Sequence, residues 1–270
     1  MIWNELTAKE IMDAPEKCGG VCLLPMGCIE RHGNHLPLGI DYMKGFFFAK
    51  MAAELEEAMV FPPYYVGALS DCYFAPGTIV YPLDLALEFL TATCNEIARN
   101  GFKKIILVNA HGGNPRLIDY FMMRFCEKDH DYMVYSIPPH FGPRTVAARK
   151  KLAEETNSTN GHAGGYETAV SLYLFPEYVK MDDVLPREVA ATEDRAKPLM
   201  EAEIGTPHWW FSRHPHHYGG YGKDATAEYG KLICDATAED IAEKIRVVKA
   251  DQTSLEIFKE MRKKGQNLEL

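Results

Sequence analysis

The chain has 270 residues, of which 47% are hydrophobic and 25% are charged, so it can bury a sizeable core. Its formal net charge of −9 argues against a nucleic acid or an anionic membrane as a partner, because both would favour a basic surface. The sequence has no signal-peptide pattern, no apolar run as long as a membrane span, and seven cysteines without a CxxC pair, so we expect a cytoplasmic protein with free thiols.

The first predicted elements are a strand, a helix and an irregular strand. Residues 20–27 form an apolar run that predicts a central strand, and residues 42–58 have the composition and apolar spacing of a helix. A second apolar run, 59–66, predicts an irregular or edge strand because it contains Pro62 and Pro63.

A second series of helices and strands follows. Residues 83–100 are the clearest predicted helix, with apolar side chains every three to four positions and Gly101 as a cap. Residues 104–109 and 132–137 are predicted to be buried strands, with a helix over 115–128 between them. Continuous apolar strands that alternate with helices predict an α/β fold, in which a mostly parallel sheet flanked by helices forms a three-layer domain.

Helical patterns dominate after residue 140. Helices are predicted over 143–157, 167–174 and 238–264. Residues 200–224 are predicted to form a long loop rich in His, Trp, Gly and Tyr. A loop of this length without secondary structure is usually functional.

Three polar clusters, at 30–41, 109–114 and 161–168, follow predicted strands or lie in glycine-rich turns, where sites form in open α/β sheets. Together they contain seven possible ligands, namely Glu30, His32, His35, Asp41, His111, His162 and Glu167. Mixed imidazole and carboxylate ligands suit Zn²⁺, Mn²⁺ or Fe²⁺ in a catalytic site, and Asp41 is a candidate to bridge two ions. Taken singly, each histidine is more often a capping or loop residue. The three clusters together predict a metal-dependent enzyme.

The residues of the first cluster belong to a recognisable signature. The segment 24–41, LPMGCIERHGNHLPLGID, closely resembles the signature of the creatininase (creatinine amidohydrolase) family. Further segments resemble the family's motifs in the expected order, at 76–78, 109–114, 162–168 and 218–230. The resemblance spans about residues 20–235. It implies a single creatininase-like domain over 1–270, with the predicted helix 238–264 at its C-terminal end.

The resemblance implies a centre of two divalent ions, often Zn²⁺ with Mn²⁺ or Fe²⁺ in the second position. Glu30, Asp41 and His111 would hold one ion. His32 and Asp41 would hold the other, so that Asp41 bridges the two.

Creatininase itself supplies a further carboxylate where this chain has Gly113. Glu167 is expected to take its place as the fifth metal ligand. The alternative for Glu167 is a buried carboxylate that is stabilised by the start of a helix.

The resemblance also implies roles for residues around the ions. His162 is expected to transfer a proton to the leaving group, and its alternative role is to orient a ligand. His35 and Asn114 are expected to support the ligands rather than to bind metal. The backbone N–H groups of Gly112 and Gly165 are candidates to stabilise an oxyanion.

Four residues of the long loop, Trp209, Trp210, Arg213 and His217, are predicted to bind a small-molecule substrate. The alternative for the two tryptophans is a lid packed against a neighbouring subunit, since the resemblance implies a homo-oligomer, with a hexamer favoured.

The expected reaction is the attack of a metal-bound hydroxide on a carbonyl carbon of a small cyclic substrate, either a cyclic amide such as creatinine or a formamide. The alternative is a hydrolase that opens the ring of an oxidised inositol, such as a 3-dehydro-scyllo-inosose, at a C–C bond. A non-catalytic homologue is disfavoured because every core ligand position is filled. A nucleotide-dependent redox enzyme is disfavoured because no GxGxxG follows the first predicted strand.

Overall fold

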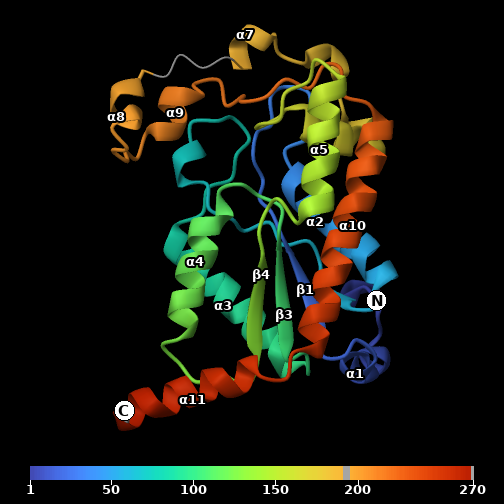
Figure 1. Cartoon of the computed structure of the whole chain (residues 1–270), viewed down its shortest axis with the longest axis vertical. Helices are drawn as coiled ribbons and strands as arrows, with labels where there is room; N and C mark the ends of the chain where they lie inside the picture. The colour runs from blue at the N-terminus through green and yellow to red at the C-terminus, as the bar shows by residue number, and fades with distance from the viewer. Residues whose placement is uncertain (191–194, 269–270) are drawn as a thin grey trace.

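The computed structural model describes residues 1–190 and 195–268, and in this part of the chain it contains one sheet of four parallel strands (Figure 1). The strands are β1 (Val21–Met26), β2 (Met59–Val60), β3 (Lys104–Asn109) and β4 (Met133–Ile137), in the order β2-β1-β3-β4. β1 and β3 pair along their whole length, from Val21 opposite Lys104 to Met26 opposite Asn109. The predicted parallel sheet is thus confirmed.

Helices cover both faces of the sheet (Figure 1). Successive residues of β1 point in opposite directions, so Cys22 and Leu24 join one core while Val21 and Leu23 join the other. The first core is closed by α1 (Ala8–Lys17), α3 (Leu83–Arg99) and α4 (Asn114–Phe125). The second is closed by α2 (Ile40–Leu55), α5 (Pro143–Glu155), α6 (Gly165–Leu174) and α10 (Ala227–Ala250). The predicted three-layer α/β architecture is confirmed.

α3 shows why the sequence predicted this helix so well. Leu87, Leu90, Cys94 and Ile97 are all buried and lie on one face, at the spacing of an amphipathic helix. Gly101, with φ of +98°, ends the helix in a conformation that favours glycine.

The second predicted strand is shorter than expected. β2 has only two residues, and the chain returns to the edge of the sheet for a single bridge between Met26 and Tyr64. Pro62 and Pro63 lie between these contacts, and because proline has no backbone N–H they cannot extend the ladder.

The predicted helix over 238–264 is wrong, because two helices occupy this part of the chain. α10 begins eleven residues earlier and ends at Ala250, and α11 (Ser254–Asn267) follows it. Asp251 separates them, since its Oδ1 accepts hydrogen bonds from the backbone N–H groups of Thr253 and Ser254. α11 crosses the lower end of the molecule (Figure 1).

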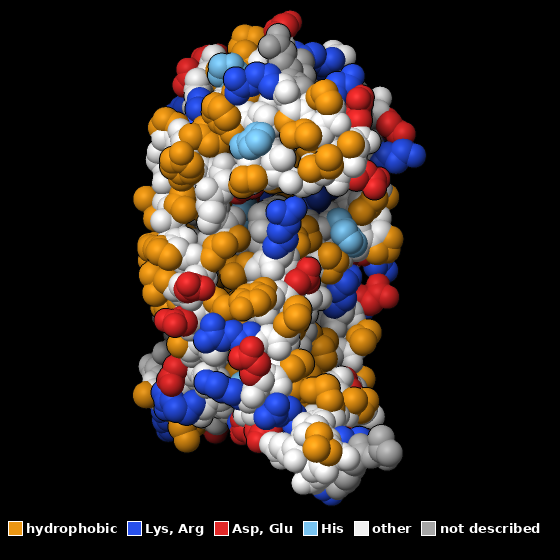
Figure 2. Space-filling model, turned by 90° about the vertical axis from the view of Figure 1, so that its left-hand side faces the viewer, with side chains coloured by type: hydrophobic (Ala, Val, Ile, Leu, Met, Phe, Trp, Pro, Cys, Tyr) orange, Lys and Arg blue, Asp and Glu red, His pale blue; other side chains and the backbone are white. Residues whose placement is uncertain are grey.

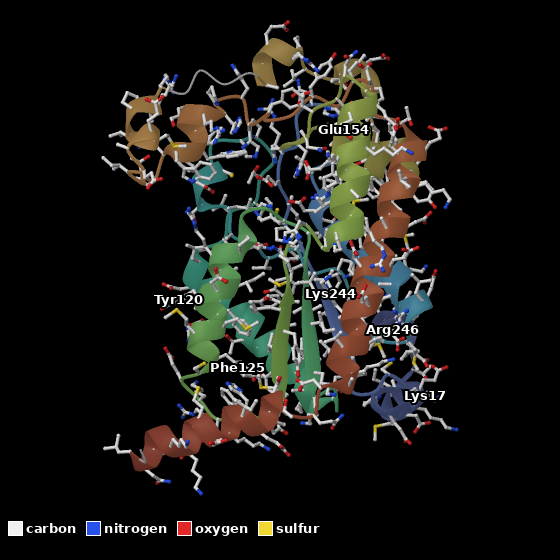
Figure 3. All side chains as sticks on the ribbon, viewed as in Figure 1. Lys17, Tyr120, Phe125, Glu154, Lys244 and Arg246 are labelled. Atoms are coloured by element: carbon white, nitrogen blue, oxygen red, sulfur yellow. The ribbon has the colours of Figure 1, made fainter. Side chains whose placement is uncertain are left out.

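α11 is anchored through aromatic side chains. Its Phe258 is buried, and the ring lies 5.3 Å from that of Phe125. Figure 3 shows Phe125 at the lower end of α4, next to α11.

The loop predicted at 200–224 contains regular structure. α8 (Lys197–Glu201) reaches into it and α9 (Trp209–Arg213) lies within it, while α7 (Arg187–Ala190) precedes both. Short 3-10 helices occur at Trp3–Glu5, Ser70–Cys72, Pro176–Tyr178 and Met181–Asp183. In the described part of the chain no helix is both long and apolar enough to cross a bilayer.

Candidate metal centre

The loops after β1 and β3 leave the sheet side by side. The last residues of the two strands, Met26 and Asn109, lie opposite each other. α2 starts against this edge because Gly27 has no side chain, and a Cβ there would lie 2.2 Å from the backbone nitrogen of Tyr42. Asp41, in the first turn of α2, is thereby held against the ends of the two strands.

Half-site A consists of Glu30, Asp41 and His111. His111 Nδ1 lies 2.8 Å from Asp41 Oδ2 and 3.3 Å from Glu30 Oε2. The Cys28 Sγ lies 3.1 Å from Asp41 Oδ2 and 3.7 Å from Glu30 Oε2. All four side chains are buried, so these donor atoms converge where little water can reach them.

Half-site B consists of His32, Asp41 and Glu167. His32 Nε2 lies 3.5 Å from Asp41 Oδ1 and 3.6 Å from Glu167 Oε2. Glu167 stands in the first turn of α6, where its Oε2 accepts a 2.8 Å hydrogen bond from the backbone N–H of Ala163. Asp41 therefore presents Oδ2 to half-site A and Oδ1 to half-site B.

Two backbone carbonyls orient the histidines of the two half-sites. His32 Nδ1 lies 3.0 Å from the carbonyl oxygen of Glu30, and His111 Nε2 lies 3.1 Å from that of Ala68. Because a carbonyl can only accept, each of these ring nitrogens carries the proton and donates it. The other nitrogen of each ring faces the carboxylates, where it would offer its lone pair to a bound ion in place of a proton, as in most metal-binding histidines.

The buried carboxylates of the two half-sites stabilise positive charge on the groups around them. Burial would lower the pKa of His111, but Glu30 and Asp41 outweigh it and raise this pKa to about 10. Burial also opposes ionisation of Asp41, but Lys44 and His32 hold the pKa of its carboxyl well below the usual range. A divalent cation would compete with protons for the same lone pairs.

The donor set fits divalent metal ions. Imidazole nitrogens and carboxylate oxygens are the ligands of Zn²⁺, Mn²⁺ and Fe²⁺ in catalytic sites. In each half-site the donor atoms lie within 4.8 Å of one another, a spacing that a single ion can span. Each half-site leaves room in the coordination shell for water or substrate, because it provides few protein ligands.

Lys44 is a part of the site that sequence reasoning missed. Its Nζ lies 2.5 Å from Asp41 Oδ1 and 2.6 Å from Glu167 Oε1, and the side chain is only 2% exposed. Lys44 lies one turn after Asp41 on α2, within a segment whose apolar spacing predicts only a packed helix. The pattern gave no signal for its role, because Glu167 is far away in the sequence.

His217 and Trp210 form a chain of hydrogen bonds that ends on Glu30. The indole N–H of Trp210 donates to His217 Nδ1 at 2.8 Å, so His217 Nε2 carries the proton that it shares with Glu30 Oε1 at 2.9 Å. His217 is fully buried. Both ring nitrogens of His217 form hydrogen bonds, and through them His217 and Trp210 hold Glu30, a predicted metal ligand, in position.

His162 lies over half-site B. Its ring centroid is 4.2 Å from that of His32, and its Nε2 donates to the carbonyl oxygen of Arg31 at 2.7 Å. Burial, together with the nearby His32, lowers the pKa of His162 to about 4. The ring is therefore neutral near pH 7, with the lone pair of Nδ1 available to accept a proton.

His35 and Asn114 lie just outside the half-sites. His35 Nε2 is 3.0 Å from the hydroxyl oxygen of Thr168, and burial lowers the pKa of His35 to about 4. The Asn114 side chain accepts a hydrogen bond from the backbone N–H of Ala68 and donates one to Asn109 Oδ1. The Ala68 bond fixes the segment whose carbonyl orients His111.

The remaining predicted binding residues are more scattered. A side chain at Gly112 would meet open space, whereas one at Gly165 would lie 2.6 Å from the Ser158 side chain. Arg213 is exposed at the end of α9, and Trp209 is half-buried. The structure brings neither Arg213 nor Trp209 into contact with a predicted metal ligand among the described residues.

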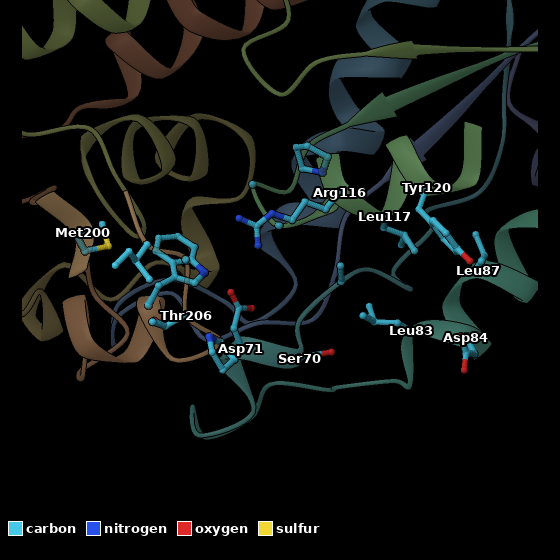
Figure 4. A pocket seen from close by; sticks show the side chains of 18 of the residues that line it. Ser70, Asp71, Leu83, Asp84, Leu87, Arg116, Leu117, Tyr120, Met200 and Thr206 are labelled. Carbon is cyan, nitrogen blue, oxygen red and sulfur yellow. The ribbon is translucent and has the colours of Figure 1, made fainter. Parts of the chain in front are cut away.

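A cleft of about 1200 Å³ lies behind half-site A. Trp209, Gly112 and Gly113 line it together with apolar residues of α3 and α4, but no predicted metal ligand does (Figure 4). Arg116 extends across the cleft toward Asp71 (Figure 4). Ala68 and Gly113 separate this space from the His111 ring.

A three-layer α/β fold with buried histidines and carboxylates at the carboxyl ends of its parallel strands is typical of a metal-dependent enzyme. The chain belongs to the creatininase family, because the family's sequence profile, described as creatinine amidohydrolase, matches residues 4–245. The motifs that indicated this family therefore identified it correctly.

Three named proteins are similar to this chain in sequence. Creatinine amidohydrolase of Pseudomonas putida is 26% identical over 257 residues, which cover 90% of this chain and 95% of the relative. The mycofactocin precursor peptide peptidase of Mycolicibacterium smegmatis is 28% identical over 60% of this chain and 61% of its own. The 3-dehydro-scyllo-inosose hydrolase of Thermotoga maritima is 24% identical over 67% of this chain and 58% of its own.

Solved structures confirm the fold. A crystal structure of creatininase superposes with a TM-score of 0.73 over 93% of this chain and 98% of the other, at 24% identity. The complex of a creatininase mutant with creatine gives a TM-score of 0.74 over 91% of this chain and 97% of the other.

Proposed function

We propose that the chain is a two-metal hydrolase that cleaves a small cyclic amide or a formamide at the centre formed by half-sites A and B. The observation that carries this proposal is the shared carboxylate of Asp41, whose two oxygens face two separate groups of donors. When bound, a pair of divalent ions at such a centre lowers the pKa of a water molecule and polarises a substrate carbonyl.

The residues around the ions would position the reactants and move a proton. Glu30, Asp41 and His111 would hold one ion, and His32, Asp41 and Glu167 the other. His162 is neutral, and its Nδ1 can take a proton from the attacking water and pass it to the leaving nitrogen. A side chain at Gly112 would meet open space, and we propose that the backbone N–H of this residue contacts the substrate oxygen.

A ring-opening hydrolase for an oxidised inositol is the second candidate. The Thermotoga maritima relative supports it. The loop offers fewer hydrogen-bond donors to a polyhydroxylated substrate than its sequence predicted, because both ring nitrogens of the buried His217 already bond to Trp210 and Glu30. For this reason we favour the amide.

Metal analysis combined with a hydrolysis screen tests the proposal. The screen contains creatinine, a formamidopyrimidine, a 3-dehydro-inosose and a short peptide, and we expect turnover of the amide or formamide with two ions per chain. Turnover of only the inosose would select the second candidate. Turnover of only the peptide would exclude both.

Asp41→Ala should abolish metal binding and turnover together, because it removes a ligand from both half-sites. Asp119→Ala, which removes an exposed carboxylate of α4, is the matched control. An Asp41→Ala protein that retains two ions would contradict the bridging role.

We also propose that the chain forms a homo-oligomer, with a hexamer favoured. Phe89, Tyr120 and Met123 on α3 and α4 are 49%, 58% and 71% exposed, which is unusual for such large apolar side chains. Hydrophobic side chains are numerous on the face that Figure 2 shows, the side on which Figure 3 places Tyr120. Light scattering coupled to size-exclusion chromatography measures the assembly, and a monomer at micromolar concentration would contradict it.

A further inference from the structure

We infer that Lys44 makes the two half-sites unequal, so that half-site A binds its divalent ion first and half-site B binds a second ion more weakly. This inference rests on the proposed function, because it assumes that both half-sites are metal sites. It assigns to Lys44 the role of a positioning cation that controls the order and the strength of metal loading.

Lys44 forms its ion pairs with the carboxylates of half-site B, and its Nζ also lies 5.5 Å from the centroid of the Tyr166 ring. Its Nζ lies 2.5 Å from Asp41 Oδ1, the oxygen that also faces His32, and 2.6 Å from Glu167 Oε1. Asp41 Oδ2, which faces half-site A, instead contacts His111 and Cys28. An ion at half-site B therefore shares the Asp41 oxygen that it faces, and the Glu167 carboxylate, with an ammonium group, whereas an ion at half-site A faces the other oxygen of Asp41.

The charge of the cluster leads to the same order of loading. When His32 and His111 are neutral, as metal binding requires, Glu30, Asp41 and Glu167 carry three negative charges and Lys44 carries one positive charge, which leaves a net charge of two negatives. One divalent ion neutralises this charge completely. The second ion then enters a site without net negative charge and beside a buried ammonium group, which water screens poorly because Lys44 is only 2% exposed.

Other groups already hold the two carboxylates in place, so orientation is not the main effect of Lys44. Asp41 Oδ2 is fixed by His111 at 2.8 Å. Glu167 Oε2 accepts a 2.8 Å hydrogen bond from the backbone N–H of Ala163 at the start of α6. Removal of the Lys44 charge should therefore strengthen metal binding at half-site B more than any loss of order weakens it.

Calorimetric titration of the metal-free protein with Zn²⁺ tests the inference, and the metal content after dialysis provides a second readout. The wild type should bind two ions in steps whose affinities differ by at least about tenfold. In Lys44→Met the second step should tighten by at least about tenfold while the first changes little. Lys44→Gln, whose amide can still donate to one carboxylate, should change in the same direction and replaces the methionine variant if that one does not fold.

Two further variants complete the design. Glu167→Gln should abolish only the weak step, because Glu167 belongs to half-site B alone. Lys104→Met is the matched control, since it removes an ammonium group that donates hydrogen bonds to the backbone carbonyls of Lys249 and Asp251. Lys104 is the first residue of β3 and therefore lies at the end of the sheet opposite to the candidate centre. Both affinities should be unchanged in this control.

The possible outcomes separate this inference from the proposed function. Two equal steps in the wild type, or an unchanged or weakened second step in both Lys44 variants, would overturn the role of Lys44 and leave the two-metal hydrolase intact. Loss of the tight step in Glu167→Gln would also overturn the order of loading. A wild-type protein that binds no divalent ion would overturn both.

Discussion

Residues of the candidate centre differ in how visible they are in the sequence. Glu30, His32 and Asp41 stand in one continuous motif, so their types and spacing were sufficient to select them. The contacts of Lys44 and His217 could not be predicted, because each depends on a partner brought close only by the fold. A lysine or a histidine is not unusual at either position in the sequence. Both residues matter because the fold buries them against carboxylates.

At the residue scale, the space around Gly113 supports the proposal that Glu167 is the fifth metal ligand. A Cβ at this position would lie 2.5 Å from His111 Nε2 and 2.6 Å from the carbonyl oxygen of Ala68. The carboxylate that the resemblance to creatininase leads us to expect at this position therefore cannot be added to this conformation without moving His111.

Gly113→Ala should displace the His111 ring and break its hydrogen bond to Ala68. We expect a loss of about 1–3 kcal/mol of stability and of the ion at half-site A. Gly112→Ala is the matched control, because a Cβ there would meet nothing within 4 Å. Urea unfolding and metal analysis measure both effects, and equal behaviour of the two variants would contradict the packing argument.

At the scale of elements, the sequence predicted the strands that are buried on both faces and the helices that bury one face. The break between α10 and α11 was missed because apolar residues continue on both sides of Asp251, and the break depends on local hydrogen bonds of this one side chain. The short helices α8 and α9 were missed because a few residues give no measurable periodicity.

The start of α5 is capped by another helix. Gly142 is the N-cap residue of α5, and it has no side chain that could accept a hydrogen bond from the first turn. Asp240 of α10 supplies the acceptor instead, and its Oδ2 lies 2.8 Å from both the backbone nitrogen and the hydroxyl oxygen of Thr145. Arg144 donates to Oδ1 at 3.1 Å.

Asp240→Ala should destabilise the protein by about 1–3 kcal/mol, because it leaves buried donors of α5 without an acceptor. Glu239→Ala is the control, since this neighbour is 59% exposed and its ion pair with Arg144 should contribute less than about 1 kcal/mol. Urea unfolding at neutral pH measures the difference, and equal loss in both variants would contradict the capping role.

The contribution of Asp240 should depend on pH. Burial opposes ionisation, but hydrogen bonds from Thr145 and Arg144 outweigh it and lower the pKa of Asp240 in the folded protein. A lowered folded pKa means that the contribution is complete above the unfolded value of about 3.9 and is lost as the pH falls through the folded pKa. The gap between wild type and Asp240→Ala should thus be constant from neutral pH down to about pH 5 and shrink below about pH 4.

At the scale of the whole molecule, the three layers were predictable because strands that are apolar on both faces require helices to cover both faces of the sheet. The convergence of three distant segments on one centre followed from the parallel sheet, whose strands β1 and β3 end at the same edge. The position of the cleft was not predictable, since residues from α3, α4 and the segment around Trp209 line it together.

Removal of metal should lower the melting temperature of the entire protein. Ions that bind only the folded chain stabilise it by about 2.7 kcal/mol when their concentration is a hundred times Kd. For a chain of this size that corresponds to a shift of roughly 5–11 °C, at about 2–4 °C for each kcal/mol. Calorimetry of the chelator-treated protein with and without Zn²⁺ measures the shift. The same shift in Asp41→Ala would show that the ion acts elsewhere.

The hydrogen-bonded chain from Trp210 through His217 to Glu30 gives the centre its own optical reporter. The protein has only three tryptophans, and Trp3 packs against Phe61 and Phe102, away from the centre. Any change in the charge on Glu30 alters the electric field along the Trp210 indole, and with it the wavelength of its fluorescence. The emission spectrum of the unlabelled protein should thus follow occupancy of half-site A in real time, and Trp210→Phe should abolish the response.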